Sequence, residues 1–600
     1  MSPSPALVRF AFVVLFVIGC TPLATAKMSA DMQLAAVLAQ ADEEDLKLNP
    51  QNALTRGDLR FADQFGDLIT DDFLRKSEAQ LREQLRQIRR VKRAALSAQD
   101  KIAYDVFRYQ AEYALRSYTL GIARIQQKLP LDHIFGQHIS FPQLSSGEGT
   151  APYKTLADYE NGLKRMDGFV LYLGRSINMM RRGIKSGHVQ IRVVAEKIIK
   201  QLDEALAGGV DASPFIGPVK AFPTDFPEAD KPRLDAEYRT AVSNKILPAL
   251  KQLQIFLQNE YLAASRSGTP GLASMPDGAK LYLYALEQHT TTRLSAEEIH
   301  RLGLAEVARI RSDMQRIRMQ VGFKGSLPEF FKHLQTDAQF QLNSKEDLIK
   351  RYGEINKRVE TVLPTLFTTL PKSKLEIKSV PAEQESSAGG AYYVVGTPDG
   401  SRPGVFYVNT SELRTRTTPR MTAIFLHEGV PGHHLQGSLA QENTKLPALL
   451  RFGYNPGYGE GWGLYCEWLG NEMGLYDDPY QYFGRLDMEI FRAARLVVDT
   501  GLHAKGWNRD KAIDYMLENS SLDRAAVEQE VDRYIVWPGQ ATAYKVGELF
   551  IRKLRDHAKA KLGERFDVRT FHEKILDTGA IPLDVLERKI NDWIASQQTN

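Results

Sequence analysis

Residues 423–436 read AIFLHEGVPGHHLQ, and the interpretation of the whole chain starts from this stretch. His427 and Glu428 follow an uncharged, mostly apolar run at residues 421–426, which predicts a helix that enters the core. Buried polar groups need partners. A histidine and a glutamate at the end of such a helix therefore indicate a site rather than a solvated surface.

The spacing of the histidines differs from that of a regular metal-binding helix. In the HExxH pattern, two histidines one turn apart bind one zinc ion and the Glu between them acts on its water. Here His433 and His434 come late, after Pro431 and Gly432. An undistorted helix would turn His433 about 120° away from His427. Because Pro cannot continue the hydrogen-bond ladder and Gly accepts unusual dihedral angles, we expect the helix to open and readmit one histidine. Spacing leaves open which one.

A second apolar segment, GYGEGWGLYCEWLG at residues 457–470, carries two carboxylates on one helical face. Glu460 and Glu467 are two turns apart in a Trp- and Tyr-rich helix, where an uncompensated carboxylate is costly. Glu460 is suited to be a third metal ligand, and Glu467 to orient a ligand histidine. The alternative is that both are ion-paired structural acids. Cys466 is expected to be a core residue.

Composition indicates a globular protein with a large core, since 43% of the 600 residues are hydrophobic and 25% are charged. The 77 basic and 73 acidic residues give a net charge of +4, which argues against a nucleic-acid partner. Helical patterns dominate and predict a mainly α fold. We expect a helical N-terminal part at residues 27–370 and a catalytic part at residues 371–600, packed as one folded unit.

One region departs from the helical pattern. Residues 374–380, 391–395 and 404–409 are β-branched and aromatic, and they predict a small antiparallel sheet just ahead of the histidine segment. One interpretation is a hairpin that covers the core. The other is an edge strand beside the site, where an extended peptide could pair by strand addition.

The N-terminus predicts export. Arg9 leads into an apolar run at residues 10–20, and an ATA cleavage site ends at Ala26, so residues 1–26 are typical of a signal peptide. The run is too short for a permanent membrane span. VIGC at residues 17–20 also resembles a lipobox, which would leave Cys20 lipidated. The ATA site slightly favours ordinary cleavage. Both routes predict an exported, periplasmic protein, and only the lipobox route would attach it to the membrane, through Cys20.

HEGVPGHHLQ followed by EGWGLYCE resembles the bacterial family known as domain of unknown function 885, whose motifs are HExxPGHH and EGWxxYxE. The resemblance covers most of the mature chain, including residues 289–304, 401–409, 501–516 and 538–555. That family is similar to helical zinc peptidases such as angiotensin-converting enzyme and thimet oligopeptidase. Dipeptidyl-peptidase III, with one residue inserted between its ligand histidines, is a precedent for a stretched motif. The resemblance implies Zn²⁺ held by His427, His433 and Glu460, with His434 as an alternative ligand.

The same resemblance implies roles for other residues. Glu428 would be the general base that takes a proton from zinc-activated water. Tyr544 is expected to stabilise the oxyanion, with His503 as runner-up; each could equally be a packed core residue with a satisfied polar group. Weaker candidates for gripping a substrate, for which surface roles are the alternative, are Arg402, Tyr407, Asn409 and Arg533.

The sequence therefore predicts an exported zinc metallohydrolase, and a carboxypeptidase or oligopeptidase for short peptides is the preferred form. One alternative is a zinc amidohydrolase that acts on a non-peptide amide or a cell-wall fragment. Another is a non-catalytic helical binding protein, against which the presence of Glu428 argues. The sequence does not indicate an oligomeric state.

Overall fold

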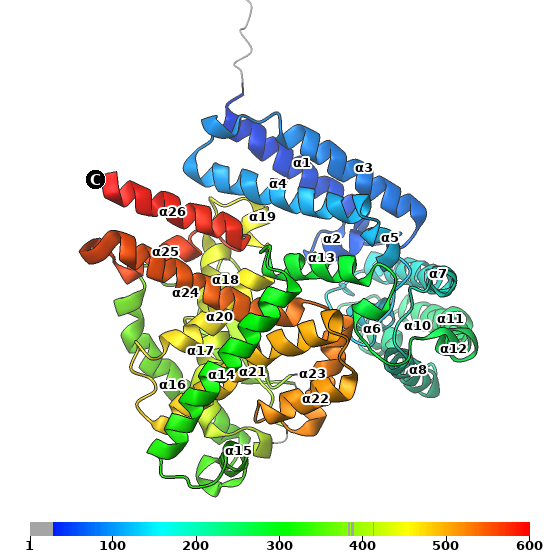
Figure 1. Ribbon diagram of the computed structural model, residues 1–600. Helices are drawn as coiled ribbons and strands as arrows, with labels where there is room; N and C mark the ends of the chain where they lie inside the picture. The colour runs from blue at the N-terminus through cyan, green and yellow to red at the C-terminus, as the bar shows by residue number, and fades with distance from the viewer. Residues whose placement is uncertain (1–27, 382–384, 386–388, 412, 600) are drawn as a thin grey trace, which may run out of the picture.

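A computed structural model describes residues 28–599, apart from residues 382–384, 386–388 and 412 (Figure 1). The fold is mainly α-helical, as predicted, with one small sheet. The predicted signal peptide and Cys20 lie outside the described residues. In the part of the chain that the structure describes, no helix has the length and apolar character needed to cross a membrane.

Three long helices pack side by side at the N-terminal end of the molecule, drawn in blue in Figure 1. They are α1 (Ala30–Leu48), α3 (Asp71–Ile88) and α4 (Ala98–Thr119). Each begins after a hydroxyl residue whose side chain accepts a hydrogen bond from the backbone N–H three residues later, namely Ser29, Thr70 and Ser97. Such caps satisfy N–H groups that the helix itself leaves unpaired. Two short helices belong to the same part of the chain: α2 (Pro50–Thr55) lies between α1 and α3, and α5 (Ile122–Gln126) follows α4.

A second group of helices lies beside this layer, at the right of Figure 1. Its apolar side chains join those of the central helices in one hydrophobic core. The group consists of α6 (Gln137–Leu144), α7 (Leu156–Ser186), α8 (Arg192–Ala207), α9 (Gly217–Lys220), α10 (Lys231–Ala241), α11 (Leu247–Phe256) and α12 (Leu262–Ala264).

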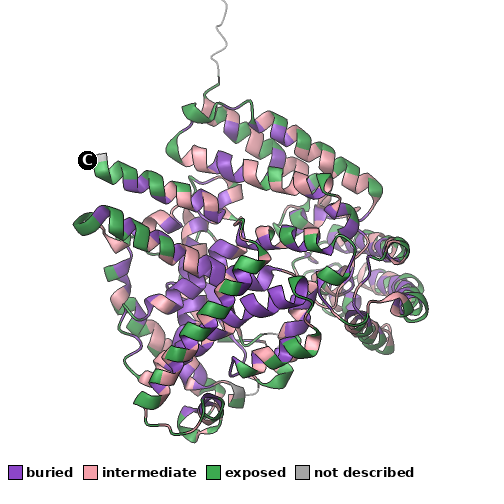
Figure 2. Cartoon of the chain, in the orientation of Figure 1, coloured by how far each residue is buried: buried purple, intermediate pink, exposed green. Residues whose placement is uncertain are grey.

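The remaining helices build the central body, where the buried residues concentrate (Figure 2). A second core cluster extends from α1, α3 and α4 into this body. The helices of the body are α13 (Gly278–Thr290), α14 (Ala296–Gln320), α15 (Leu327–Thr336), α16 (Lys345–Leu366), α17 (Met421–Glu428), α18 (His433–Glu442), α19 (Ala448–Arg451), α20 (Pro456–Leu469), α21 (Pro479–Ala504), α22 (Arg509–Glu518), α23 (Arg524–Val536), α24 (Ala543–Leu562), α25 (Val568–Leu576) and α26 (Leu583–Thr599).

Glycines let α20 and α24 approach closely. A Cβ atom on Gly547 of α24 would lie 1.9 Å from the carbonyl oxygen of Gly457 in α20. A Cβ atom on Gly461 would lie 2.6 Å from the Cα of Gly547. Neither contact is possible with a larger residue, so the glycines fix the distance between the two helices. Because α20 carries Glu460 and α24 carries Tyr544, this contact also places two predicted site residues relative to each other.

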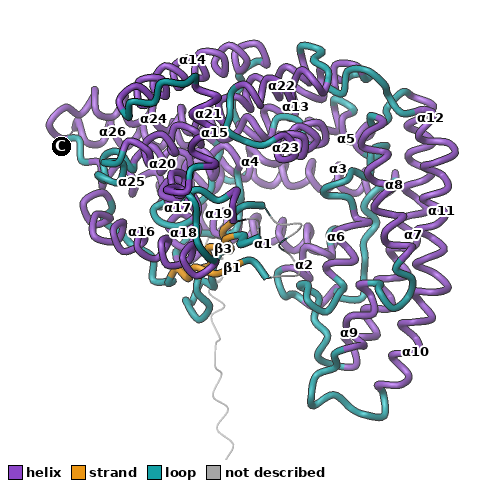
Figure 3. Tube along the Cα trace, turned by 90° about the horizontal axis from the view of Figure 1, so that it is seen from below, coloured by secondary structure: helices purple, strands orange, loops and turns teal. Residues whose placement is uncertain are grey.

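The sheet is mixed, which corrects the prediction of an antiparallel sheet. Its strands are β1 (Leu375–Ser379), β2 (Ala391–Val394) and β3 (Gly404–Val408), in the order β1-β3-β2. The β2–β3 pair is antiparallel, but β1 pairs with β3 in parallel. Strand propensity does not specify which neighbour a strand pairs with, and here the last strand enters between the first two. The sheet lies near α17 and α18 in Figure 3, and β2 forms one of its edges.

Candidate metal centre

The histidine segment folds as two helices with a break between them. α17 ends at Glu428 and α18 begins at His433. The peptide bond before Pro431 is cis, and a Cβ atom on Gly432 would lie 1.9 Å from the carbonyl oxygen of His427. The Pro-Gly pair thus ends one helix and permits the tight return into the next. The predicted opening of the helix is confirmed.

Three side chains converge at this break. Nε2 of His427 lies 3.4 Å from Oε2 of Glu460, and Nε2 of His433 lies 3.5 Å from the same oxygen. One donor atom from each of the three residues lies within 4.8 Å of the others. The two imidazole rings are nearly perpendicular, at 88°, with their centroids 4.8 Å apart. Residues separated by up to 33 positions in the sequence therefore present their donor atoms to one point.

Two of the three donor separations fit a tetrahedral zinc ion. With zinc–ligand bonds of about 2.1 Å, two ligands of a tetrahedral site are separated by about 3.4 Å. The His427–Glu460 and His433–Glu460 separations are 3.4 and 3.5 Å. Two histidines and one carboxylate are also an established donor set for catalytic zinc, with the fourth position left for water. The donor set therefore fits the metal that the sequence predicts.

A surrounding layer of polar groups fixes the ligand side chains. Nδ1 of His427 lies 2.8 Å from Oε1 of Glu467, a fully buried carboxylate, so that the imidazole N–H donates to it. The hydroxyl of Tyr454 donates to Oε1 of Glu460 at 2.7 Å, which leaves Oε2 directed at the histidines. Arg492 lies 3.7 Å from Glu467. Partners of this kind orient metal ligands and raise their basicity.

The electrostatics of the cluster reflect these contacts. Burial alone would lower the pKa of His427, but hydrogen bonds to Glu460 and Glu467 outweigh it and raise the pKa to about 9. Burial would likewise raise the pKa of Glu460, yet the two histidines hold it well below its usual range. The carboxylate thus stays ionised, which is the form that binds a cation.

His434 points away from the cluster. Its Nδ1 lies 3.0 Å from the Tyr393 hydroxyl and its Nε2 lies 3.1 Å from the Ser373 carbonyl oxygen. Burial lowers its pKa to about 4, so the ring is neutral at physiological pH. Both ring nitrogens are occupied by structural contacts, contrary to the alternative in which His434 serves as the ligand. The structure brings His433 to the cluster instead.

The cluster opens into a cavity of about 530 Å³. Glu428 and Tyr544 line it together with His427 and His433. Burial raises the pKa of Glu428 above its ordinary value. The Tyr544 ring is roughly parallel to that of His427, with a centroid separation of 6.4 Å. The predicted general base and the first-choice oxyanion donor thus face the same space as the ligands.

His503 and Arg533 do not reach this space. His503 is buried between two backbone groups: Nδ1 accepts from the N–H of Leu272 at 3.1 Å and Nε2 lies 2.9 Å from the carbonyl oxygen of Tyr534. The runner-up role for His503 is therefore corrected to a structural one. Arg533 donates to the side chains of Gln540 and Glu530. Neither residue is among those that line the cavity.

The three candidates on and near β3 are also outside the cavity lining. Arg402 is exposed in the β2–β3 loop, and Asn409 is buried and donates to the carbonyl oxygen of Glu385. Tyr407 stacks on Tyr392, with ring centroids 5.2 Å apart, and Tyr392 itself lines the cavity. Tyr407 therefore supports the cavity wall only indirectly, by packing against the Tyr392 ring that lines it.

Several lining residues escaped the sequence analysis. Arg492 and Arg495 enter the cavity from α21, and Tyr393 enters from β2. The signal for the arginines was available: FRAARLVV at residues 491–498 places two arginines three positions apart in an apolar helix, where a charge needs a partner. Tyr454 gave no such signal because its role depends on the fold of the loop before α20.

The sequence pattern of the family described as bacterial protein of unknown function (DUF885) matches residues 50–590. The chain belongs to this family. No curated protein matches it. Membership in DUF885 agrees with the resemblance carried by the two motifs, while the family's description assigns no activity.

Two solved structures share this fold. The chain is 28% identical to a "putative lipoprotein" from Colwellia psychrerythraea, with a TM-score of 0.84 over 95% of this chain and 100% of that one. It is 18% identical to a "putative lipoprotein of unknown function" from Shewanella oneidensis, with a TM-score of 0.72 over 94% and 99% of the two chains. The second likeness shows the fold alone. Both cover nearly the whole chain, so the helical layer, the body and the sheet recur as one architecture.

Proposed function

We propose that this member of DUF885 is a zinc-dependent hydrolase that cleaves peptide bonds. The observation that carries the proposal is the convergence of His427, His433 and Glu460, with both histidines at tetrahedral spacing from Glu460, beside Glu428 in one cavity. When bound, zinc would lower the pKa of a water ligand to about 7 and polarise a substrate carbonyl.

The protein's own side chains supply the remaining chemistry. Glu428 follows ligand His427 directly and lines the cavity, so its carboxylate is available to accept the proton of the attacking water and to pass it to the leaving amine. Tyr544 offers a hydroxyl for the oxyanion from the wall that α24 provides. Glu467 holds His427 in one orientation through the 2.8 Å contact at Nδ1.

The sheet favours a peptide over a non-peptide amide. β2 is an edge strand, and its residues Tyr392 and Tyr393 line the cavity that holds the ligands. An edge strand beside a cleavage site can pair with an extended backbone and hold it by main-chain hydrogen bonds. A cell-wall fragment or an isolated amide offers fewer such groups.

The test is metal content followed by peptide digestion. Purified residues 27–600 are expected to contain about one zinc per chain and to cleave members of a mixed peptide library. Glu428→Gln is expected to keep the metal and lose roughly 10² to 10⁴ of the rate. A chain without metal after zinc is added back would overturn the proposal. A metal-containing chain that cleaves only non-peptide amides would instead support an amidohydrolase function.

We also propose that the protein is exported and anchored through Cys20. The lipobox-like VIGC and the lipoprotein description of the 28% identical structure support this. Mass spectrometry of the mature N-terminus distinguishes the routes: a diacylated Cys20 supports the anchor, and an unmodified N-terminus at residue 27 contradicts it. Cys20→Ser is the matched control.

A further inference from the structure

A second and larger cavity adjoins the candidate metal centre. It has a volume of about 1090 Å³ and lies between α1, α3 and α4, with residues of α13 and α19 also lining it. Phe452 and Gly453 line both this outer cavity and the inner cavity at the metal centre. The next residue, Tyr454, donates to Glu460. Consecutive Cα atoms are about 3.8 Å apart. The place where the two cavities meet is therefore next to Tyr454, whose side chain is hydrogen-bonded to the proposed metal ligand Glu460.

The junction exposes two aromatic rings. The exposed fractions of Phe452 and Tyr454 are 52% and 63%, although both rings lie beside cavities. Arg451 lies over the Phe452 ring at 4.9 Å from its centroid. Large apolar surface left open next to a polar site is typical of places that contact a ligand. The rings therefore offer a surface over which a chain can pass from one cavity to the other.

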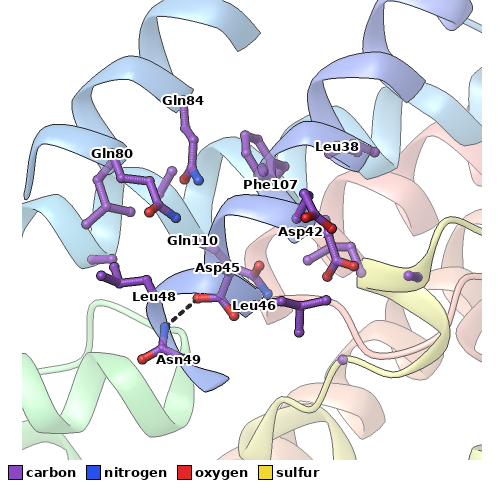
Figure 4. Close-up of a pocket in the computed structure, with 18 of the residues that line it drawn as sticks. Leu38, Asp42, Asp45, Leu46, Leu48, Asn49, Gln80, Gln84, Phe107 and Gln110 are labelled. Atoms are coloured by element: carbon purple, nitrogen blue, oxygen red, sulfur yellow. Dashed lines mark hydrogen bonds between the residues drawn. The ribbon is translucent and has the colours of Figure 1, made fainter. Parts of the chain in front are cut away.

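The outer cavity presents amide groups suited to a peptide backbone. Figure 4 shows Gln80 and Gln84 of α3 among the residues that enclose it, with Gln110 of α4 and Asp45 of α1. Gln84 is only 6% exposed. A carboxamide both donates and accepts, so a row of them matches the alternating N–H and C=O groups of an extended peptide.

Charge gives the two cavities opposite character. The outer lining contains four carboxylates and two guanidiniums. Arg56 pairs with Asp42 and Arg60 pairs with Glu43, whereas Asp45 accepts from the neutral amide of Asn49 at 2.9 Å. The inner lining contains three guanidiniums and two carboxylates, and Arg492 and Arg495 also face Glu467 and Glu530, which lie outside the lining. An N-terminal ammonium group is therefore favoured in the outer cavity and a C-terminal carboxylate in the inner one.

We propose that the outer cavity is an extended subsite that binds the N-terminal part of a peptide whose scissile bond lies at the metal centre. This inference rests on the proposed function and narrows its substrates to oligopeptides with a free N-terminus, cleaved toward their carboxyl end. The N-terminal layer of α1, α3 and α4 then acts in substrate binding as well as in packing.

The test is a length series digested by the zinc-loaded chain, with libraries of tri-, hexa- and octapeptides, each with free and acetylated N-termini. Hexapeptides with free N-termini are expected to show roughly tenfold higher kcat/KM than tripeptides, the effect of about 1.4 kcal/mol of added binding. Acetylation is expected to reduce cleavage of the longer peptides and leave tripeptides unchanged.

Two variants assign the effect to the cavity. Gln84→Leu is expected to lessen the advantage of length, and Asp45→Asn, which keeps an oxygen for Asn49, to remove the preference for a free N-terminus. Gln87→Leu is the matched control, because Gln87 is on the same helix, bonds to Glu83 and does not line the cavity. Cleavage that is independent of length, or unaffected by both variants, overturns the subsite and leaves the proposed function intact. No cleavage at any length overturns both.

Discussion

Nδ1 of His427 in α17 lies 2.8 Å from Oε1 of Glu467 in α20, on the side of the imidazole opposite the candidate metal centre. The carboxylate can only accept, so the contact fixes the proton on Nδ1 and leaves Nε2 free to bind a metal. A buried acid in this position would control the orientation and the basicity of His427 as a metal ligand.

Glu467→Gln is therefore expected to weaken zinc binding by roughly 10- to 100-fold while the fold is retained, because the amide oxygen still accepts from Nδ1 but the charge is lost. Competition with a chelator of known affinity measures the change. Glu472→Gln removes a carboxylate that pairs with Arg555 near the surface, and it serves as the control. Equal zinc affinity in the two variants would show that Glu467 is only a packing residue.

Substitution is expected to distinguish the roles of the adjacent residues His433 and His434. His433→Ala is expected to lose most of the metal, since it removes one of the three proposed ligands. His434→Ala is expected to keep the metal but to unfold more easily, by about 1–3 kcal/mol, because it leaves the Ser373 carbonyl and the Tyr393 hydroxyl without their partner. Metal content and the thermal midpoint of each variant are the measurements. Loss of zinc in His434→Ala alone would reverse the assignment.

Tyr544→Phe tests the proposed oxyanion donor. The substitution keeps the ring beneath Arg495, whose guanidinium lies 4.7 Å from the ring centroid, and removes only the hydroxyl. Turnover is expected to fall by about 10² to 10³ with little change in KM or in zinc content. A decrease of less than a few-fold at normal metal content would assign the oxyanion to another group.

The geometry of the candidate metal centre was predictable where it depends on local rules. Pro431 and Gly432 come after an apolar helical run, where Pro interrupts the hydrogen-bond ladder, so the break before His433 follows from the sequence alone. Glu460 could be proposed because a carboxylate in an apolar helix needs a partner. The helical fold class follows from periodicity in the same way.

What could not be predicted depends on contacts between distant segments. His503 bonds to the backbone of Leu272, 231 residues earlier, and no local pattern reports that contact. The parallel pairing of β1 with β3 is likewise a choice among neighbours that strand propensity leaves open. Tyr454 reaches Glu460 only because its loop folds back over α20. In each case the residue type is compatible with several roles, and tertiary packing determines which of them the residue has.

Asp499 gives the protein a pH-dependent stability that is separate from the metal centre. Its carboxylate is buried in α21 and accepts from the Tyr282 hydroxyl at 2.6 Å and from the N–H of Gly539 at 3.0 Å. Burial raises its pKa to about 7 despite those two hydrogen bonds, from an ordinary value of 3.8. The neutral form is thus the one that the fold favours.

The sign of the effect follows from linkage. A folded-state pKa above the unfolded value contributes stability that is complete below about pH 4 and is lost as the pH rises to about 7. A shift of about three units corresponds to roughly 4 kcal/mol. Asp499→Asn stays neutral and keeps an oxygen for both donors, so it should be more stable than the wild type at pH 8 and differ little near pH 4. Thermal midpoints of both proteins across this range give the difference, and parallel curves would show that Asp499 does not titrate in this window.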